Sequence, residues 1–119
     1  MSNVKAALGE VMGIDGAIAC ALVDANSGMM LGGAGSGFDL EIAAAGNTEV
    51  VRAKLKTMQA LGLKEKIEDI LITLGSQYHI ITLLGEKPGL FLYTALDKNK
   101  ANLAMARRKC SEVVKTVAL

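Results

Sequence analysis

The sequence is poor in the residue types on which many small functional sites depend. Among its 119 residues are one proline, one histidine, two cysteines and no tryptophan, and aromatic residues make up 3%. Two cysteines without a CxxC motif or a Cys/His cluster argue against a disulfide framework and against a metal site. We therefore interpret Cys20 and Cys110 as small buried hydrophobic residues and expect neither a metal nor a cofactor.

Long apolar runs and an excess of one charge are also missing. No stretch approaches the roughly 18 apolar residues of a membrane span, and the N-terminus lacks the basic and apolar regions of a signal peptide. The net charge of +1 does not favour nonspecific nucleic-acid binding. We expect a cytoplasmic protein that neither inserts into membranes nor binds nucleic acid. Its hydrophobic content of 51% is nevertheless high, so the surplus apolar surface is expected to meet protein.

The chain is long enough for one domain with a real core and too short for two ordinary ones, so residues 1–119 are treated as a single domain. Apolar periodicity and turn residues predict helix, two strands, helix, three strands and helix. The predicted ranges are 3–12, 17–24, 29–33, 39–61, 67–74, 78–84, 90–96 and 99–117. Short turns between the last strands require antiparallel pairing. Continuously apolar strands need cover on both faces, which predicts an α+β fold with the middle helix on one face and the terminal helices on the other.

The predicted helix 39–61 has two apolar stripes, although a small domain needs only one. The bulky stripe suits packing on a sheet and consists of Leu40, Ala44, Val51, Leu55 and Met58. The second stripe has mostly small side chains, which let another backbone come close, and consists of Ile42, Ala43, Gly46, Val50, Ala53, Ala60 and Leu61. Polar residues separate the stripes, among them Asn47 and Lys54 on one side and Thr48 and Arg52 on the other. The second stripe indicates a second partner.

Glycines at 32, 33, 35 and 37 precede this helix and invite comparison with a phosphate-binding loop. Phe38 and Asp39 stand where a P-loop has Lys and Ser/Thr, and Phe38 also takes the place of the third glycine of a dinucleotide fingerprint. Asp39 and Glu41 put negative charge at the helix N-terminus, where an anion would bind. We interpret the segment as a flexible connection with Asp39 as the N-cap. Contact with a ligand is the less favoured alternative.

Catalytic residues are not evident elsewhere. His79 has no nearby sequence pattern that supplies the partner required for acid–base work, so a structural or edge-strand histidine is favoured over a catalytic one. The serines lack a nucleophile elbow, and the carboxylates lack calcium-loop spacing. Carboxylates brought together only by folding stay an open alternative. We expect no catalytic residues and no enzymatic activity.

Several segments resemble the roadblock/dynein-light-chain family over nearly the whole chain. They are Ile14-Asp15-Gly16-Ala17, Leu22-Val23-Asp24, the Ser27-Gly28 turn and the long Ala-rich helix. The resemblance implies the profilin-like order αββαβββα and a five-stranded antiparallel sheet with strand order 2-1-5-4-3. It also implies a homodimer in which the long helices pack together and the third strands pair edge to edge.

That edge pairing would bring Glu68 and Asp69 opposite their copies in some registers. We therefore expect the two-fold axis nearer Leu71. The predicted dimer interface consists of Ile42, Gly46, Val50, Ala53, Ala60, Ile70, Leu71 and Ile72.

Family members are non-enzymatic platforms, and the bacterial ones regulate small Ras-like GTPases. The resemblance therefore implies a stand-alone bacterial or archaeal roadblock domain that forms a homodimer and regulates such a GTPase. No family-level catalytic residues exist to carry over. The alternative is a small-ligand-sensing domain of profilin/longin-like architecture, which requires an apolar cavity with a few converging polar groups. An enzyme would require a clustered acid–base pair in a cleft.

Overall fold

The computed structural model describes residues 2–119, and its elements follow the predicted order. They are α1 (Val4–Met12), β1 (Ala17–Asp24), β2 (Met29–Gly35), α2 (Leu40–Ala60), β3 (Asp69–Thr73), β4 (Gln77–Leu83), β5 (Leu90–Asp97) and α3 (Leu103–Val114). The strands form one five-stranded sheet with the order β2-β1-β5-β4-β3, and every neighbouring pair is antiparallel. The α+β fold and the strand order are both confirmed.

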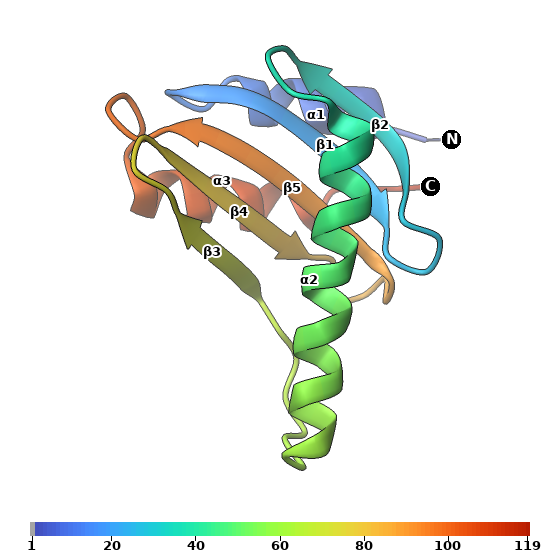
Figure 1. Ribbon diagram of the computed structural model, residues 1–119. Helices are drawn as coiled ribbons and strands as arrows, with labels where there is room; N and C mark the ends of the chain where they lie inside the picture. The colour runs from blue at the N-terminus through green and yellow to red at the C-terminus, as the bar shows by residue number, and fades with distance from the viewer. Residues whose placement is uncertain (1) are drawn as a thin grey trace.

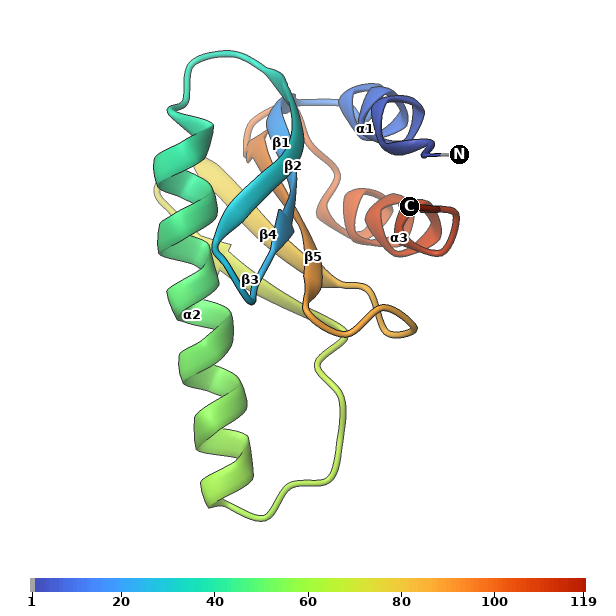
Figure 2. The same ribbon diagram turned by 90° about the vertical axis from the view of Figure 1, so that its right-hand side faces the viewer.

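The helices divide between the two faces of the sheet. Figures 1 and 2 show α2 on one face, with α1 and α3 side by side on the other. Leu8, Leu22 and Cys110 belong to the core under α1 and α3, whereas Val51 and Tyr93 belong to the core under α2. Because side chains alternate along a strand, neighbouring strand residues supply both cores. The predicted layer arrangement is confirmed.

The ends of the long helix follow from side-chain and glycine chemistry. The Asp39 carboxylate accepts a hydrogen bond from the Ile42 backbone N–H at 3.1 Å, as an N-cap does. At the other end, Leu61 is the C-cap, and Gly62 has a φ of +72°, a conformation that glycine adopts without strain. Among residues 2–119, no helix combines the length and the apolar character that crossing a bilayer requires.

The last helix is shorter than the predicted range 99–117. The Asn102 side chain accepts a hydrogen bond from the Met105 N–H at 3.1 Å, so the helix begins at Leu103. An N-cap asparagine fixes a helix start in this way because its own backbone is extended. Val117 is still buried, although it lies beyond the helix.

The predicted strand 29–33 is confirmed and continues to Gly35, so the interpretation of the glycine-rich segment as a flexible connection was wrong for the part that belongs to β2. A Cβ at Gly32 would lie 2.9 Å from Val4 Cγ1 of α1. A Cβ at Gly33 would lie 2.8 Å from Leu40 Cδ1 of α2. Such contacts are too short for carbon atoms. These glycines therefore let helices on both faces pack close to the strand.

β3 is shorter than the predicted range 67–74. The Glu68 carbonyl accepts a hydrogen bond from the Leu83 N–H at 3.1 Å, and Leu83 is the last residue of β4. Residues before Glu68 therefore have no strand residue opposite them. They form instead the connection that returns from the end of α2 (Figure 2).

Candidate interaction surface

The second apolar stripe of α2, which we call the outward stripe, lies in solvent. Ile42 is 70% exposed and Val50 36% exposed, and Gly46, Ala53 and Ala60 are also exposed. A Cβ added at Gly46 would have no atom within 4 Å. In the described chain, these five predicted interface residues therefore form an exposed apolar stripe of mostly small side chains.

The boundaries of the two α2 stripes differ from the prediction at three residues. Leu55 was assigned to the sheet-packing stripe but is 46% exposed, because this part of α2 extends beyond the sheet (Figure 1). Thr48 was assigned to the polar boundary but is buried, and its hydroxyl donates to the Ala44 carbonyl at 2.7 Å. Ala43 was assigned to the outward stripe but is half-buried against the core. Ala44, Val51 and Met58 are buried as predicted.

The three remaining predicted interface residues lie on β3, which is an edge of the sheet. The Glu68 carbonyl and the Leu74 N–H both point to β4, where they bond Leu83 and Gln77. Backbone polar groups alternate in direction along an antiparallel strand. The N–H and C=O groups of Asp69, Leu71 and Thr73 therefore point away from the sheet, as an unpaired edge does.

The side chains of β3 divide between the two faces. Ile70 packs against the core under α2, and Leu71 packs against the core on the α3 side. Ile72 shares the face of Ile70, since strand side chains alternate. The structure therefore brings Ile70 and Ile72 to the same face as α2, whereas Leu71 lies on the opposite face.

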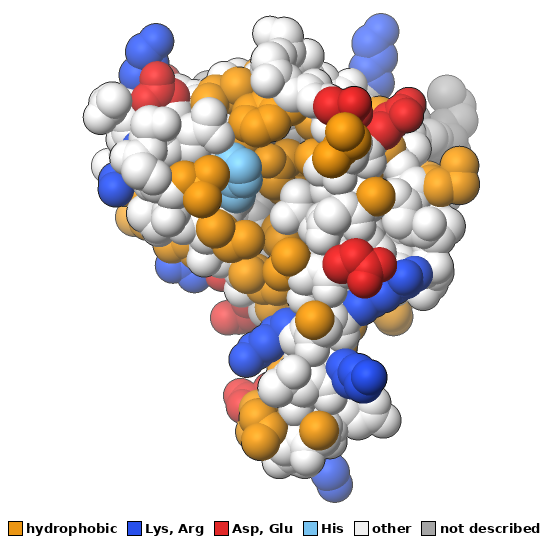
Figure 3. All heavy atoms as spheres, viewed as in Figure 1, with side chains coloured by type: hydrophobic (Ala, Val, Ile, Leu, Met, Phe, Trp, Pro, Cys, Tyr) orange, Lys and Arg blue, Asp and Glu red, His pale blue; other side chains and the backbone are white. Residues whose placement is uncertain are grey.

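An apolar patch lies on the α2 face beside that helix. α2 packs mainly on β1 and β2, which leaves β3 and β4 less covered. Figure 3 shows hydrophobic side chains and the single histidine gathered there, next to α2. We call these residues the β3–β4 patch; each is half-buried, and they are Ile70, Ile72, His79 and Leu83.

His79 is a hydrogen-bonded structural residue in this patch. Its Nε2 lies 2.8 Å from Gln77 Oε1, and its Nδ1 lies 3.2 Å from the Tyr93 hydroxyl. Because an amide oxygen can only accept, Nε2 donates to Gln77, and in the neutral imidazole Nδ1 accepts from the Tyr93 hydroxyl. Burial lowers the pKa of His79. Both ring nitrogens have hydrogen-bond partners, as expected of a structural histidine. The edge-strand version of that interpretation is wrong because β4 lies between β3 and β5.

One of the two acids at the start of β3 has a cationic partner. Arg107 of α3 donates from Nε and Nη2 to the two carboxylate oxygens of Asp69, at 2.9 and 2.8 Å. This bidentate contact offsets the charge of Asp69 at the sheet edge. The sequence gives no sign of this contact, because the two residues lie 38 positions apart.

The two cysteines are buried and free of any disulfide. Burial, with a smaller contribution from the neighbouring Cys110, raises the pKa of Cys20 to about 11. Burial also raises the pKa of Cys110. A thiol held neutral in this way is a poor nucleophile and a poor metal ligand. Among residues 2–119, no three His, Cys, Asp or Glu side chains gather as a metal site would require.

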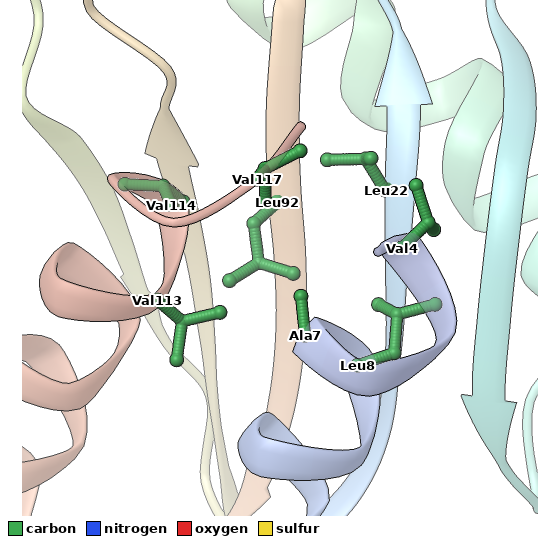
Figure 4. Close-up of a pocket in the computed structure, with 8 residues that line it drawn as sticks. All are labelled: Val4, Ala7, Leu8, Leu22, Leu92, Val113, Val114 and Val117. Atoms are coloured by element: carbon green, nitrogen blue, oxygen red, sulfur yellow. The ribbon is translucent and has the colours of Figure 1, made fainter. Parts of the chain in front are cut away.

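The closed cavity under α1 and α3 is too small for a ligand. Figure 4 shows apolar side chains of α1, α3, β1 and β5 pointing toward one another around a cavity of about 10 Å³. Such a volume holds at most about one water molecule. The cavity lining has no polar side chain among the described residues, and consists of Val4, Ala7, Leu8, Leu22, Leu92, Val113, Val114 and Val117. This small cavity is therefore not the site that a ligand sensor requires. A larger, open pocket of about 380 Å³ lies between the end of α1 and α3, and polar and apolar side chains line it, among them Glu10, Ile14 and Lys109.

Comparison with solved structures identifies the fold class as that of roadblock/LC7 domains. A roadblock/LC7 domain from Streptomyces avermitilis superposes with a TM-score of 0.78 at 16% identity, over 91% of this chain and 88% of that one. MglB from Myxococcus xanthus superposes with a TM-score of 0.82 at 18% identity, over 94% of this chain and 89% of that one.

A third similar structure is MglC from Myxococcus xanthus, with a TM-score of 0.62 at 16% identity, over 93% of this chain and 92% of that one. No family sequence model and no curated protein sequence matches the chain. The roadblock resemblance inferred from residue patterns is thus confirmed by the three-dimensional fold.

Proposed function

We propose that this chain is a homodimeric interaction platform whose copies join through α2 and β3. The observation that carries the proposal is the exposed apolar stripe of α2 on a molecule whose β3 edge is also unpaired. An exposed apolar stripe and an open strand edge each favour association. One two-fold contact would cover both.

The backbone directions favour a two-fold axis at Leu71. With Leu71 opposite its own copy, Asp69 faces Thr73 of the second copy, and all three outward-pointing residues exchange backbone hydrogen bonds. This register gives the full overlap of β3, since Leu71 is the central residue of Asp69–Thr73. It also keeps each Asp69 away from its copy. Ile70 and Ile72 of both copies would then extend the apolar patch across the joined sheet.

The proposed client is a small Ras-like GTPase, which the platform binds and regulates in the cytoplasm without catalytic residues of its own. The roadblock resemblance supports this client, as does the fold similarity to MglB and MglC. A non-enzymatic role is supported by the chemistry of the candidate groups. His79 uses both ring nitrogens in hydrogen bonds, and both cysteines are buried.

Light scattering tests the dimer. The expected mass is twice the chain mass of 12.4 kDa. Ala53→Glu should give the monomer, because a charge buried in the helix contact lacks a partner. Ala104→Glu on exposed α3 is the matched control and should stay dimeric. A wild-type mass of one chain at micromolar concentration would reject the homodimer.

A second experiment tests the client. Material isolated from the native cell and analysed by mass spectrometry should contain a P-loop GTPase, which is then purified separately. The wild-type platform should change its rate of GTP hydrolysis or nucleotide exchange, and Ala53→Glu should have less effect. A GTPase whose rates and binding are indifferent to the platform would contradict this assignment while leaving the dimer intact.

A further inference from the structure

The C-terminal half of α2 projects beyond the sheet. Figures 1 and 2 both show its last turns and the following loop extending past the ends of the strands. We call residues 54–66 the arm. A helix of 21 residues is about 31 Å long, which exceeds the span of the short strands that it crosses. The arm is therefore a convex projection.

The apex of the arm is apolar. Leu61 is 67% exposed and Leu63 is 45% exposed, and Gly62 between them takes a left-handed turn with a φ of +72°. Leu55, which lies earlier in α2, is also 46% exposed. Large aliphatic side chains exposed together on a projecting turn indicate a surface that binds a partner.

The arm is also positively charged, whereas the remaining residues together are negatively charged. It carries Lys54, Lys56, Lys64 and Lys66 against the single acid Glu65, a net charge of +3. The whole chain has a net charge of +1, so the residues outside the arm together carry −2. Within residues 2–119, none of the arm lysines forms an ion pair. The charge of the arm is therefore available to an anionic partner.

The residue types favour a lipid surface over a protein as that partner. Protein interfaces are depleted in lysine and take much of their energy from Trp, Tyr and Arg, and residues 54–66 contain none of these three. Lysines around exposed aliphatic side chains are typical of segments that bind the headgroup region of anionic membranes. A convex apex can enter a fluid bilayer without a preformed matching pocket.

We propose that the arm docks on the surface of an anionic lipid bilayer. Leu61 and Leu63 enter the headgroup region, and the arm lysines lie against the lipid phosphates. This binding is peripheral and reversible, because the buried apolar surface is small. The arm shares Ala60 and Leu61 with the outward stripe that the proposed two-fold contact uses, so the dimer mass is measured beside vesicle binding.

Vesicle cosedimentation of the full chain tests the proposal. Wild-type protein should bind vesicles of phosphatidylcholine mixed with phosphatidylglycerol, and rising salt should release it because the attraction is screened. Vesicles of phosphatidylcholine alone should bind little. Lys56→Glu with Lys64→Glu should lower the partition coefficient roughly tenfold or more. Leu61→Ser with Leu63→Ser should also lower it, with the unfolding temperature unchanged because both side chains are exposed.

Matched control variants change the same chemistry elsewhere. Lys5→Glu with Lys100→Glu reverses two exposed lysines outside the arm, and Met105→Ser removes a side chain that is 69% exposed on α3. Both controls should bind vesicles as the wild type does. Equal binding to neutral vesicles, equal losses in the controls, or no binding at low salt would overturn the proposal. Loss of dimer mass in the leucine variant without loss of vesicle binding would assign the apex to a second copy instead.

Discussion

The two faces of the sheet are covered to different degrees. On the α1/α3 face, helices and strands enclose a cavity of only about 10 Å³, and Leu8, Val11 and Leu22 are at most 4% exposed. On the other face a single helix covers β1 and β2 and then runs beyond the sheet (Figure 1). Ile42, Leu55 and the β3–β4 patch stay partly or largely in solvent there.

This difference separates apolar residues that stabilise the fold from those available for recognition. Burying a large aliphatic side chain contributes about 1.5–3 kcal/mol of free energy. The side chains under α1 and α3 are buried within one chain, so they contribute this free energy to folding. The outward residues of α2 gain it only when something covers them. Substitutions on the first face should therefore alter stability, and those on the second should alter association.

Core truncation on the α1/α3 face should have the largest effect. Leu22 is 2% exposed, so Leu22→Ala should lower the free energy of unfolding by about 2–5 kcal/mol. Ile42→Ala should change it by less than about 0.5 kcal/mol in the monomer, because its side chain is already solvated. Urea denaturation at low protein concentration measures both. Comparable losses in the two variants would mean that the faces do not differ as described.

Two glycine substitutions should have opposite signs. Gly32→Ala places a Cβ 2.9 Å from Val4 Cγ1 and 3.1 Å from Leu8 Cδ1, so it should destabilise the chain by about 1 kcal/mol or more. Gly46→Ala places a Cβ in open space and should stabilise α2 by up to about 1 kcal/mol. Thermal unfolding of dilute protein checks both signs. A stable Gly32→Ala variant would show that α1 does not pack closely on β2.

The ion pair at the β3 edge should have a smaller effect. Arg107→Ala removes the bidentate contact to Asp69, and an exposed pair of this kind contributes at most about 1 kcal/mol. Arg108→Ala is the control, because that side chain is 82% exposed and pairs with Glu112 on its own helix. Both are measured by urea denaturation at low and high salt. Equal effects of the two substitutions would show that the Asp69 contact does not matter.

The pH dependence of His79 should be the smallest effect. Burial lowers its pKa in the folded state below the ordinary 6.5, so the unfolded chain binds more protons between the two values. The free energy of unfolding is therefore full above the ordinary pKa, falls as the pH falls below it, and levels off below the folded pKa. Unfolding temperatures at about pH 7.5 and about pH 5 should differ more for wild type than for His79→Gln. Identical pH profiles would contradict the neutral imidazole.

The local periodicity of the sequence predicted the burial of helix residues where burial depends on helix geometry alone. Val51 is buried because the helical repeat places it on the sheet side of α2. The exposure of Leu55 could not be predicted, since it depends on where the sheet ends beneath the helix. The tight packing of Gly32 depends on Val4 of α1, a long-range contact that the predicted strand 29–33 does not reveal.

Long-range pairings limited how much of the candidate site could be predicted from the sequence. The β1–β5 pairing joins residues about as far apart as Val23 and Phe91, and the strand order came from the family resemblance, not from the hairpin patterns. Sequence spacing likewise could not join Arg107 to Asp69 or Tyr93 to His79. The dimer interface remains a prediction, now with its α2 residues in solvent and its β3 residues at an open edge.

Amide hydrogen exchange across a dilution series tests the central claim most directly, because it reads the β3 edge residue by residue. If two copies pair at Leu71, the amides of Asp69, Leu71 and Thr73 should be protected in concentrated protein and should lose protection as the dimer dissociates. The amides of Ile70 and Ile72, which face β4, should be protected at every concentration. A dimeric mass with rapid exchange at Leu71 would contradict the account, because the copies would then be joined elsewhere.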